Sequence, residues 1–489
     1  MQGLKELDVE LSPVDGRYQS YTRKLSSFLS EAGLNRARIN VEIEWVIALC
    51  DGLPATGFDE DGKPWVEGLP TLSGVQKSAL RKIVDDFDLD SVARLAEHEA
   101  TTKHDVKAVE YYIKDELLNL KNQGTFNENE YNKLFQAIHV FCTSEDINNL
   151  SYAISIRNAV EKIWIPALLD LIKVLEELAQ ENAQVPMLAK THGQPATPTT
   201  LGKEIAVFIY RLRRQFDRLE QQEYLGKING ATGTFGAHFV SVETALWPRF
   251  AKWFVEERLH LTYNPLTTQI ESHDWDAELF GTINHIDRIL HNLATDVWMY
   301  ISNDVFAQIP EEGATGSSTM PHKINPIKFE NAEANLEIAD ALFSKLSETL
   351  VTSRMQRDLT DSTTQRNIGV AFGHSMIALG NLTAGLKALN VNKEHLLKEL
   401  EENPAVLGEA VQTVMRVQGI KGGDGMENPY ERLKKFSRGE AIDYAGMQKF
   451  INELTLEDDV KAKLLKLKPQ DYIGLAPQLV EVVSEGVVS

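Results

Sequence analysis

The 489-residue sequence has few of the features that mark secreted, membrane-bound or metal-binding proteins. It contains two cysteines, Cys50 and Cys142, which cannot form a disulfide framework or a metal motif. No stretch approaches the roughly 18 uninterrupted apolar residues of a membrane-spanning helix, and the N-terminus lacks the apolar core of a signal peptide. These absences predict a protein of the reducing cytoplasm.

Basic residues are also scarce relative to acidic ones. The chain has 50 Lys and Arg against 71 Asp and Glu, a formal net charge of −21. Such a chain on average repels nucleic-acid backbones and anionic membranes, so neither is an expected partner. A small anion can still bind where particular arginines, lysines, serines and helix N-termini converge.

Helical periodicity is abundant, whereas strand-like alternation is scarce. Apolar residues at spacings of three and four predict a long helix over 200–225, and segments 285–305 and 331–350 follow the same rule. A similar stripe runs from Val160 to Leu178, with Pro166 predicting a kink or a late helix start. The fold class predicted is all-α, with the long helices packed in a bundle.

Hydrophobic residues make up 43% and charged residues 25% of the chain, which is typical of folded domains, and the length suggests about three of them. We expect an N-terminal helical domain over 1–133, a central long-helix bundle over 134–386 and a C-terminal helical domain over 387–489. A Gly/Pro/Asp-rich stretch at 51–74 interrupts the first. Asn392 is a plausible N-cap at the start of the third, and the loop 421–429 interrupts it.

Segment 313–326 reads GATGSSTMPHKINP, a small polar loop that composition alone would identify as a solvated linker. The string resembles the GSSxMPxKxNP motif of the aspartase/fumarase superfamily, whose loop supplies a catalytic serine. The resemblance implies that Ser317 is the general base. Ser318 is the alternative, and the spacing of six residues to Lys323 favours Ser317. Lys323 and Asn325 suit the stabilisation of the dianion formed when a proton is removed next to a carboxylate.

Segment 188–198 reads LAKTHGQPATP and precedes the long helix that starts near residue 200. A lone histidine at such a junction is usually a cap or a core residue. The segment is similar to the superfamily's THGQPATP string, in which His192 falls at the position of the general acid. A histidine that titrates near neutrality can protonate a departing amine as its C–N bond breaks.

Two further strings, TTKHDV at 101–106 and CTSEDI at 142–147, each precede a helical pattern. From the residues alone, Asp105 is as plausible an N-cap as a ligand, and Thr143 or Ser144 could equally cap a helix or contact substrate. Both strings resemble the adenylosuccinate lyase family, in which they contact the nucleotide or the succinyl group. The resemblance implies that the following residues bind substrate: Lys103, His104, Asp105, Thr143 and Ser144.

Segment 356–367 reads QRDLTDSTTQRN and matches the same family's nucleotide-binding pattern through Arg357, Ser362 and Arg366. Arginine forks suit phosphate, although an exposed arginine usually marks a solvated helix face. Further matches implied to contact substrate are Arg17, Tyr18 and Gln269.

Some patterns carry no chemistry in this interpretation. The glycines of 230–236 are spaced like a dinucleotide-binding motif, but no strand is predicted before them, as that motif requires. We therefore predict a turn near the site. The glycine-rich segment at 421–426 lacks the spacing of a phosphate loop. Acidic residues around His273 form no closed ligand set, so no metal is required and no cofactor is expected.

The resemblance to adenylosuccinate lyases of the bacterial type spans nearly the whole chain. It implies elimination of fumarate from adenylosuccinate, giving AMP, and from succinylaminoimidazolecarboxamide ribotide, giving AICAR, in purine biosynthesis. It further implies a homotetramer built on the helical bundle, with active sites shared between subunits. Lys103 occupies a position that varies in the family, and the stretches at 51–74 and 421–428 look longer than expected.

Two alternatives remain at this stage. Argininosuccinate lyase, fumarase and the carboxymuconate cycloisomerases share the serine loop, but are not expected to combine it with the motifs around His104, Thr143 and Arg357. A helical-bundle structural protein could keep the fold without turnover, although the presence of Ser317 and His192 argues against this.

Overall fold

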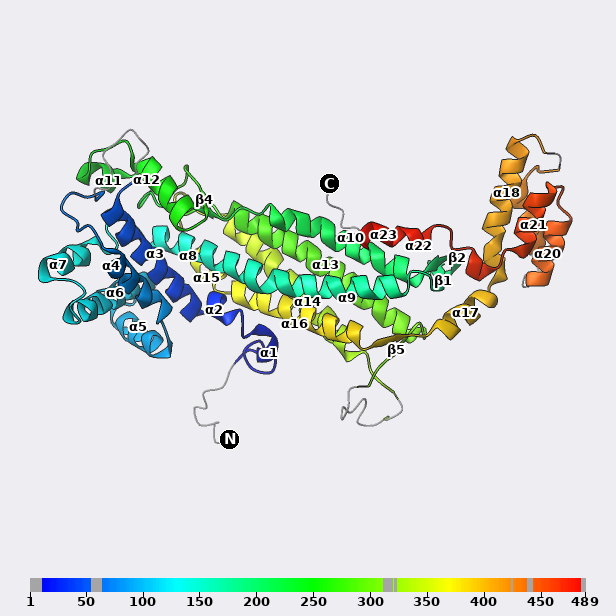
Figure 1. The fold of residues 1–489 in the computed structure, drawn as a ribbon, viewed down its shortest axis with the longest axis horizontal. Helices are drawn as coiled ribbons and strands as arrows, with labels where there is room; N and C mark the ends of the chain where they lie inside the picture. The colour runs from blue at the N-terminus through cyan, green and yellow to red at the C-terminus, as the bar shows by residue number, and fades with distance from the viewer. Residues whose placement is uncertain are drawn as a thin grey trace. The chain divides into compact units, whose positions relative to one another are not determined.

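The computed structural model describes residues 11–53, 64–310, 320, 323–423, 425–437 and 443–484. Within these ranges the chain is built almost entirely of helices, with three short two-stranded sheets (Figure 1). The prediction of an all-α fold is confirmed.

Most of the N-terminal helices begin at a side chain that caps the helix. Their bounds are α1 (Gln19–Thr22), α2 (Ser26–Leu29), α3 (Glu31–Asp51), α4 (Gly74–Asp85), α5 (Leu89–Thr102), α6 (Asp105–Asn122) and α7 (Glu128–Ala137). Helices α3 to α7 each have such a cap, whereas the one-turn helices α1 and α2 have no side-chain cap. Ser73 with Gln76 and Asn127 with Glu130 form capping boxes, which satisfy backbone N–H groups that have no partner inside the helix.

Helix α3 is buried on nearly all sides, as expected for the central helix of this region. Ile39, Ile43 and Ile47 belong to a hydrophobic cluster that also contains Val109 and Tyr112 from α6. This cluster supports α6, whose N-terminus carries two of the predicted substrate residues.

Long helices form the middle of the chain. Their bounds are α8 (Ser144–Ala159), α9 (Ile165–Glu181), α10 (Leu201–Glu220), α13 (Asp274–Ser302), α14 (Ile327–Leu350) and α16 (Ile368–Lys387). The helices predicted over 200–225, 285–305 and 331–350 therefore exist, although α13 begins earlier than expected and α10 ends earlier.

The helix around Pro166 does not start late at the proline. Helix α8 continues through a π-helical turn, η1 (Val160–Trp164), into α9. At this turn the Ile165 N–H reaches back to the carbonyl of Val160, five residues earlier. Because proline has no N–H to donate, a single wider turn lets the helix pass the missing hydrogen bond.

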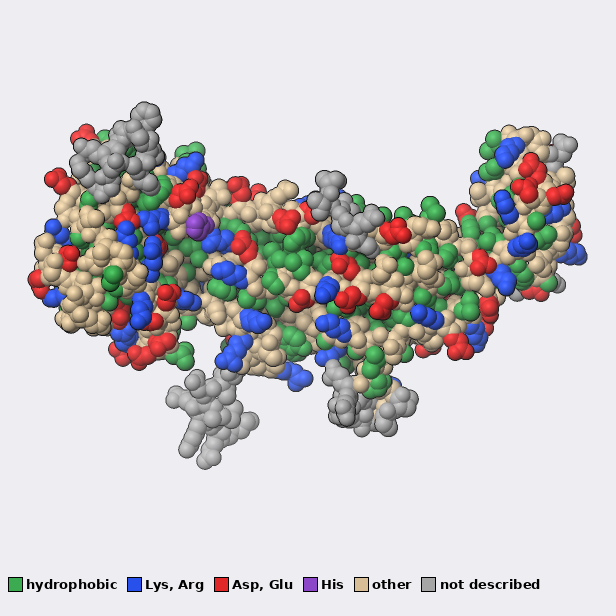
Figure 2. Space-filling view, in the orientation of Figure 1, with side chains coloured by type: hydrophobic (Ala, Val, Ile, Leu, Met, Phe, Trp, Pro, Cys, Tyr) green, Lys and Arg blue, Asp and Glu red, His purple; other side chains and the backbone are tan. Residues whose placement is uncertain are grey.

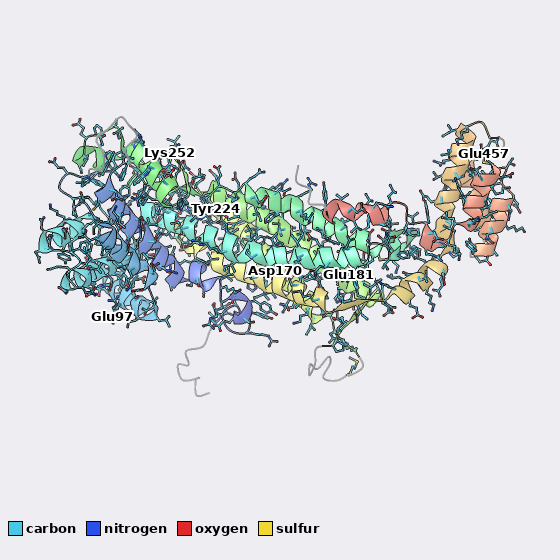
Figure 3. The ribbon with its side chains drawn as sticks, in the orientation of Figure 1. Glu97, Asp170, Glu181, Tyr224, Lys252 and Glu457 are labelled. Atoms are coloured by element: carbon cyan, nitrogen blue, oxygen red, sulfur yellow. The ribbon has the colours of Figure 1, made fainter. Side chains whose placement is uncertain are left out.

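Helix α9 shows how the apolar stripe orients these helices. Leu168, Leu171 and Leu175 are fully buried. Asp170 and Glu181 lie on its exposed side, where Figure 3 labels them. The spacing of the leucines therefore selects which face of the helix is covered.

Aromatic side chains pack between three of the long helices. Phe280 of α13, Phe343 of α14 and Phe372 of α16 are all fully buried. The ring of Phe343 lies 5.6 Å from that of Phe280 and 5.1 Å, edge to face, from that of Phe372. Such offset geometries are favourable for aromatic rings and fix the three helices against one another.

A β-hairpin that the sequence did not predict precedes α10. Strands β1 (Pro186–Thr191) and β2 (Gln194–Thr200) pair antiparallel, and only His192 and Gly193 lie between them. Both residues have positive φ, 53° and 72°, as a two-residue hairpin turn that matches the twist of its strands requires. The Lys190 ammonium lies 2.8 Å from the Glu399 carboxylate of α17 (Lys393–Glu401).

The remaining strands and short helices connect the long helices. Strands β3 (Leu225–Gly226) and β4 (Thr262–Tyr263) pair in parallel, and β5 (Phe306–Gln308) pairs antiparallel with β6 (Leu389–Val391). The short helices are α11 (Gly236–Ser241), α12 (Trp247–Trp253), the π-helical η2 (Phe254–Arg258) and α15 (Thr360–Gln365).

The C-terminal region has a hydrophobic cluster of its own, which includes Leu407, Met415 and Ile451. Asn392 caps α17 by accepting a hydrogen bond from the His395 N–H, as predicted. The other elements of this region are η3 (Pro404–Leu407), α18 (Gly408–Ile420), α19 (Pro429–Ser437), α20 (Tyr444–Asn452), α21 (Asp458–Lys466), η4 (Pro469–Asp471), α22 (Ala476–Leu479) and α23 (Glu481–Ser484).

The chain divides into two compact units. Unit 1 comprises 1–167, 217–288 and 335–378, and unit 2 comprises 168–216, 289–334 and 379–489. The boundaries fall inside the long helices α9, α10, α13, α14 and α16. The division into three domains stays a prediction.

Candidate active site

The residues predicted to bind the nucleotide all belong to unit 1, although they come from five separate segments of the chain. They are Arg17, Tyr18, Lys103, His104, Asp105, Thr143, Ser144, Gln269, Arg357, Ser362 and Arg366. Direct hydrogen bonds and ion pairs join several of them.

His104 begins α6, where free backbone N–H groups favour an anion. Its Nδ1 accepts a hydrogen bond from the Lys107 N–H at 3.2 Å, so His104 is the N-cap. Asp105 is the first residue of the helix and is therefore not its N-cap, while its contact with the substrate stays a prediction. Lys103, just before, adopts a left-handed backbone conformation that ends α5, and its side chain is exposed.

The Asp105 carboxylate lies between two arginines. Its Oδ2 is 2.8 Å from an Arg38 nitrogen and 3.2 Å from an Arg366 nitrogen. Burial by itself would raise the pKa of Asp105, but the charges of Arg38 and Arg366 and the Val106 N–H together hold this pKa below its ordinary value. Asp105 is therefore ionised at neutral pH and positions Arg366.

Arg357 joins three segments. Its guanidinium donates to Glu145 at 2.9 Å, to the side-chain oxygen of Gln269 at 3.3 Å and to the Ser362 hydroxyl at 3.3 Å. Its Nε is buried and has no acceptor among the described residues. A buried donor without a partner is costly, so this nitrogen suits an acceptor that arrives with a ligand.

Glu145 and Arg38 link the two arginine clusters into one polar network. Asn148 donates to the Glu145 carboxylate at 2.8 Å and accepts from the Arg38 Nε at 2.9 Å. The network therefore runs without a break from Arg357 to Arg366. Buried networks of this kind hold side chains in one geometry because each member would be left unpaired by a rearrangement.

Thr143 and Ser144 start α8, with Thr143 at the N-cap position. The Asp146 carboxylate accepts from the Thr143 N–H at 2.8 Å and pairs with the Lys227 ammonium at 2.8 Å, and both charged side chains are fully buried. Asp146 also accepts from the Gly230 N–H. The glycine-rich turn that begins at Gly230 thus lies against the start of α8.

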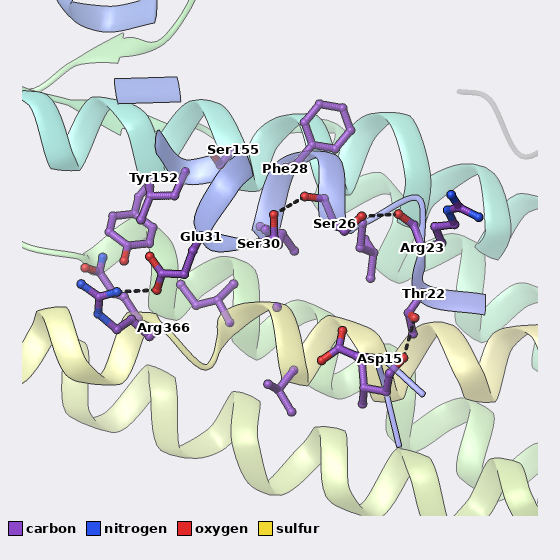
Figure 4. Close-up of a pocket in the computed structure, with 18 of the residues that line it drawn as sticks. Asp15, Thr22, Arg23, Ser26, Phe28, Ser30, Glu31, Tyr152, Ser155 and Arg366 are labelled. Atoms are coloured by element: carbon purple, nitrogen blue, oxygen red, sulfur yellow. Dashed lines mark hydrogen bonds and ion pairs between the residues drawn. The ribbon is translucent and has the colours of Figure 1, made fainter. Parts of the chain in front are cut away.

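A cavity of about 340 Å³ opens beside Arg366. Figure 4 shows its wall, where the Glu31 carboxylate pairs with Arg366 near Tyr152 and Ser155 of α8. Asp15 and Gln19 also line it. Arg17 and Tyr18 lie between these two residues in sequence, but they are not among the residues that line the cavity.

Of the residues predicted to carry out the chemistry, His192, Lys323 and Asn325 belong to unit 2. His192 is exposed at the tip of the hairpin. Lys323 is exposed and Asn325 is half-buried, and both lie just before α14. Ser317 and Ser318 lie outside the described residues.

The chain is matched by family models along most of its length. Residues 16–338 match the lyase family model, and residues 353–473 match the model of the adenylosuccinate lyase C-terminal region. It is 43% identical to adenylosuccinate lyase of Haemophilus influenzae, over 97% of this chain and 98% of that one. Adenylosuccinate lyase of Escherichia coli K12 is 42% identical, over 96% and 98%. The chain belongs to the adenylosuccinate lyases.

Two solved structures share the fold of this chain at low sequence identity. A fumarate lyase from Mesorhizobium superimposes with a TM-score of 0.71 at 16% identity, over 95% of this chain and 98% of that one. The 3-carboxy-cis,cis-muconate lactonizing enzyme from Pseudomonas putida gives 0.70 at 18%, over 96% and 98%. At this identity the likeness shows the fold alone. The predicted aspartase/fumarase-like, all-α fold is confirmed.

The sequence did not single out Arg38 and Glu145, which hold the adenylosuccinate lyase motifs together. Arg38 lies in helix α3 and is 2% exposed. Arg36 and Asn40 stand close to it in sequence, so no local pattern separates this buried charge, which needs a partner, from the half-buried polar residues of the same helix. Glu145 lies inside the CTSED motif but carried no assigned role.

Neither a metal site nor a membrane span stands out where the structure is described. No group of three or more His, Cys, Asp or Glu side chains in the described ranges could hold a metal ion. No described helix is both long and apolar enough to cross a bilayer.

Proposed function

We propose that this chain eliminates fumarate from adenylosuccinate, giving AMP, and from succinylaminoimidazolecarboxamide ribotide, giving AICAR. Membership of the adenylosuccinate lyases supports this proposal. The observation that carries it is the polar network from Gln269 and Arg357 to Asp105 and Arg366, which joins the motifs of distant segments through direct hydrogen bonds and ion pairs.

In the proposed reaction, Ser317 removes the proton from the succinyl carbon next to a carboxylate. The electron pair left on that carbon forms the double bond of fumarate as the bond from the neighbouring carbon to the purine-side nitrogen breaks. His192 gives its proton to that nitrogen, which leaves as the amine. Lys323 and Asn325 stabilise the negative charge that accumulates on the carboxylate before the C–N bond breaks.

The hairpin supports the role proposed for His192. Its imidazole stands exposed at the tip of two paired strands, and the ion pair between Lys190 and Glu399 holds the first strand. A rigid hairpin presents a proton donor with little loss of side-chain freedom when substrate binds.

The other half of the site is proposed to hold the nucleotide. Arg366, which lines the cavity, is proposed to bind the phosphate together with Arg17 and Tyr18, and the Nε of Arg357 supplies an unused donor. The residues proposed to complete the contacts are Lys103, His104, Asp105, Thr143, Ser144, Gln269 and Ser362.

We further propose a homotetramer in which neighbouring copies complete each active site. The nucleotide residues belong to unit 1 and His192, Lys323 and Asn325 to unit 2, as expected for sites shared between copies. Large apolar side chains exposed on the long helices support this association. They include Leu169, Val207, Tyr210, Trp298 and Met299, and Figure 2 shows hydrophobic side chains between charged ones along the long helices.

We propose that the enzyme works in the cytoplasm, where its thiols stay reduced. Cys50 and Cys142 are both free. Burial, with the nearby charge of Asp51, raises the pKa of the Cys50 thiol to about 12, which keeps it protonated and unreactive.

The experiment that tests the function mixes purified protein with adenylosuccinate and follows the release of fumarate and AMP. We expect stoichiometric release of both products, and a Ser317→Ala control slower by on the order of 10²-fold or more with an unchanged fold. If the wild-type protein releases no fumarate, or if Ser317→Ala is as active as wild type, the proposal is wrong.

A further inference from the structure

His273 lies in unit 1 immediately before α13 and takes no part in the proposed chemistry. Its side chain is 4% exposed, and its backbone adopts the left-handed conformation with φ of 61°. A histidine is uncommon in this conformation, and a buried imidazole needs partners for both ring nitrogens. The Nδ1 of His273 has a carboxylate partner, whereas its Nε2 has no hydrogen-bond partner among the described residues and faces a second carboxylate.

Carboxylates face this imidazole from two helices. Its Nδ1 is 2.7 Å from Oδ2 of Asp276 in α13, and its Nε2 is 3.9 Å from Oδ2 of Asp361 in α15. Glu271, which accepts from the His273 N–H at 2.8 Å, and the Gln365 amide at 3.5 Å complete the polar groups around it.

These neighbours keep the imidazole charged. Burial by itself would lower the pKa of His273, but interactions with Asp276 and Asp361 outweigh it and raise the pKa to about 10. Asp276 is 1% exposed and Asp361 is 6% exposed. Two buried carboxylates without a cation between them would repel each other strongly, so the imidazolium holds α15 against the start of α13.

The residues on either side of this pair are those proposed to bind the nucleotide. The other oxygen of Asp361 accepts from the Ser362 N–H at 2.6 Å, and the Ser362 hydroxyl accepts from Arg357 at 3.3 Å. Gln269, which also accepts from Arg357, stands four residues before His273 in the same connection. His273 thus fixes two of the three segments that meet at Arg357.

We propose that His273 is a positioning residue for nucleotide binding, which as a buried imidazolium holds Ser362, Arg357 and Gln269 in the geometry that receives the substrate. This inference rests on the proposed function, because it takes these three residues as nucleotide contacts. Its loss impairs binding of the substrate more than the elimination step, since Ser317 and His192 lie on other segments.

The test is His273→Asn, because asparagine tolerates the left-handed backbone but carries no charge. We expect KM for adenylosuccinate to rise about tenfold or more, kcat to change less than about threefold, and Kd for AMP by calorimetry to rise in parallel with KM. The wild-type KM should also rise more steeply than that of the variant as the pH approaches 10.

His374→Asn is the matched control, since His374 is also a buried histidine of unit 1 but bonds to Asn335. It should lower the melting temperature without changing KM. Asp361→Asn provides a second variant should His273→Asn fail to fold. It keeps an oxygen for the Ser362 N–H but removes the charge that faces His273, so KM should rise as well.

The inference is overturned if folded His273→Asn or Asp361→Asn keeps the wild-type KM and the wild-type affinity for AMP, because His273 would then be only a structural residue. The proposed function would still stand in that case, provided that the wild-type protein turns over adenylosuccinate. A wild-type protein that neither releases fumarate nor binds AMP would overturn both.

Discussion

Arg357 connects more parts of the candidate site than any other residue described above. Its guanidinium reaches Glu145, Gln269 and Ser362, which come from three different segments. Only a planar fork with several donors can serve acceptors in these directions at once. The identity of this one side chain therefore decides whether three segments meet correctly.

Arg357→Lys should accordingly weaken substrate binding. A lysine keeps the positive charge but cannot hold Glu145, Gln269 and Ser362 together, so we expect KM for adenylosuccinate to rise on the order of 10- to 100-fold. Steady-state kinetics with adenylosuccinate measure the effect. An unchanged KM would show that Arg357 serves the fold and not the nucleotide.

His192 allows its chemical role to be separated from its structural one. Asparagine favours the left-handed conformation that the hairpin turn requires, so His192→Asn should keep the hairpin but lose the proton donor. We expect kcat to fall by about 10²- to 10⁴-fold, with binding of substrate measured by calorimetry largely retained. Weakened binding with a normal kcat would instead make His192 a ligand.

At the scale of elements, glycine determines how closely the hairpin region packs on α9. Gly202 stands at the start of α10, and a Cβ there would come within 2.3 Å of the Ala179 carbonyl oxygen and 2.6 Å of the Ala183 nitrogen. These are backbone atoms at the end of α9 and just after it, so they cannot turn aside as a flexible side chain could.

Gly202→Ala should therefore destabilise the protein by roughly 1–3 kcal/mol, despite the higher helix propensity of alanine. Gly281→Ala in α13 is the matched control, because no atom lies within 4 Å of its added Cβ. There alanine should stabilise the helix by up to about 1 kcal/mol. Melting temperatures of the two variants measure the difference, and equal shifts would contradict the packing described for Gly202.

At the scale of the whole molecule, buried histidines make stability depend on pH. Burial alone would lower the pKa of His139, but the hydrogen bond to Glu42 and the charges of Glu42 and Glu110 raise this pKa. The pKa of His273 is likewise raised, to about 10. Stability from a raised histidine pKa is complete below the ordinary value of about 6.5 and is lost as pH rises through the folded-state value. Burial lowers the pKa of His238 to about 4, which removes stability as pH falls below 6.5.

We therefore expect the melting temperature to be highest near pH 6.5 to 7 and to fall both toward pH 4 and toward pH 10. Calorimetric scans at fixed protein concentration measure this, because association also changes the melting temperature. A melting temperature that stays constant from pH 7 to pH 10 would mean that His273 is not charged in the folded protein.

Shared active sites can be tested by mixing subunits. Ser317→Ala and Arg357→Ala should each be nearly inactive alone, since each lacks one half of the proposed site. If neighbouring copies complete each site, random reassembly of equal amounts of the two variants gives about a quarter of the sites both an intact Ser317 and an intact Arg357. Activity should return to that level. A mixture that stays inactive would show that one copy supplies the whole site.

The sequence alone determined the helical class, the positions of the long helices and the family. The stripe from Leu201 to Leu219 predicts α10 because the period of apolar residues is a local property of the chain. Asn392 likewise caps α17 through a bond to a residue three positions away. The substrate motifs identify the family because each is a short contiguous string.

Only the tertiary structure decided which of these motifs meet and what holds them. Arg38, Asp105 and Arg366 are brought together by the packing of α3 and α6 and by the turn after α15, and no local pattern encodes that pairing. The hairpin that carries His192 also escaped prediction, because Pro195 and Pro198 obscure the alternation of its second strand. Contacts between residues far apart in sequence depend on how whole helices pack, and a buried charge reveals its partner only once that packing is known.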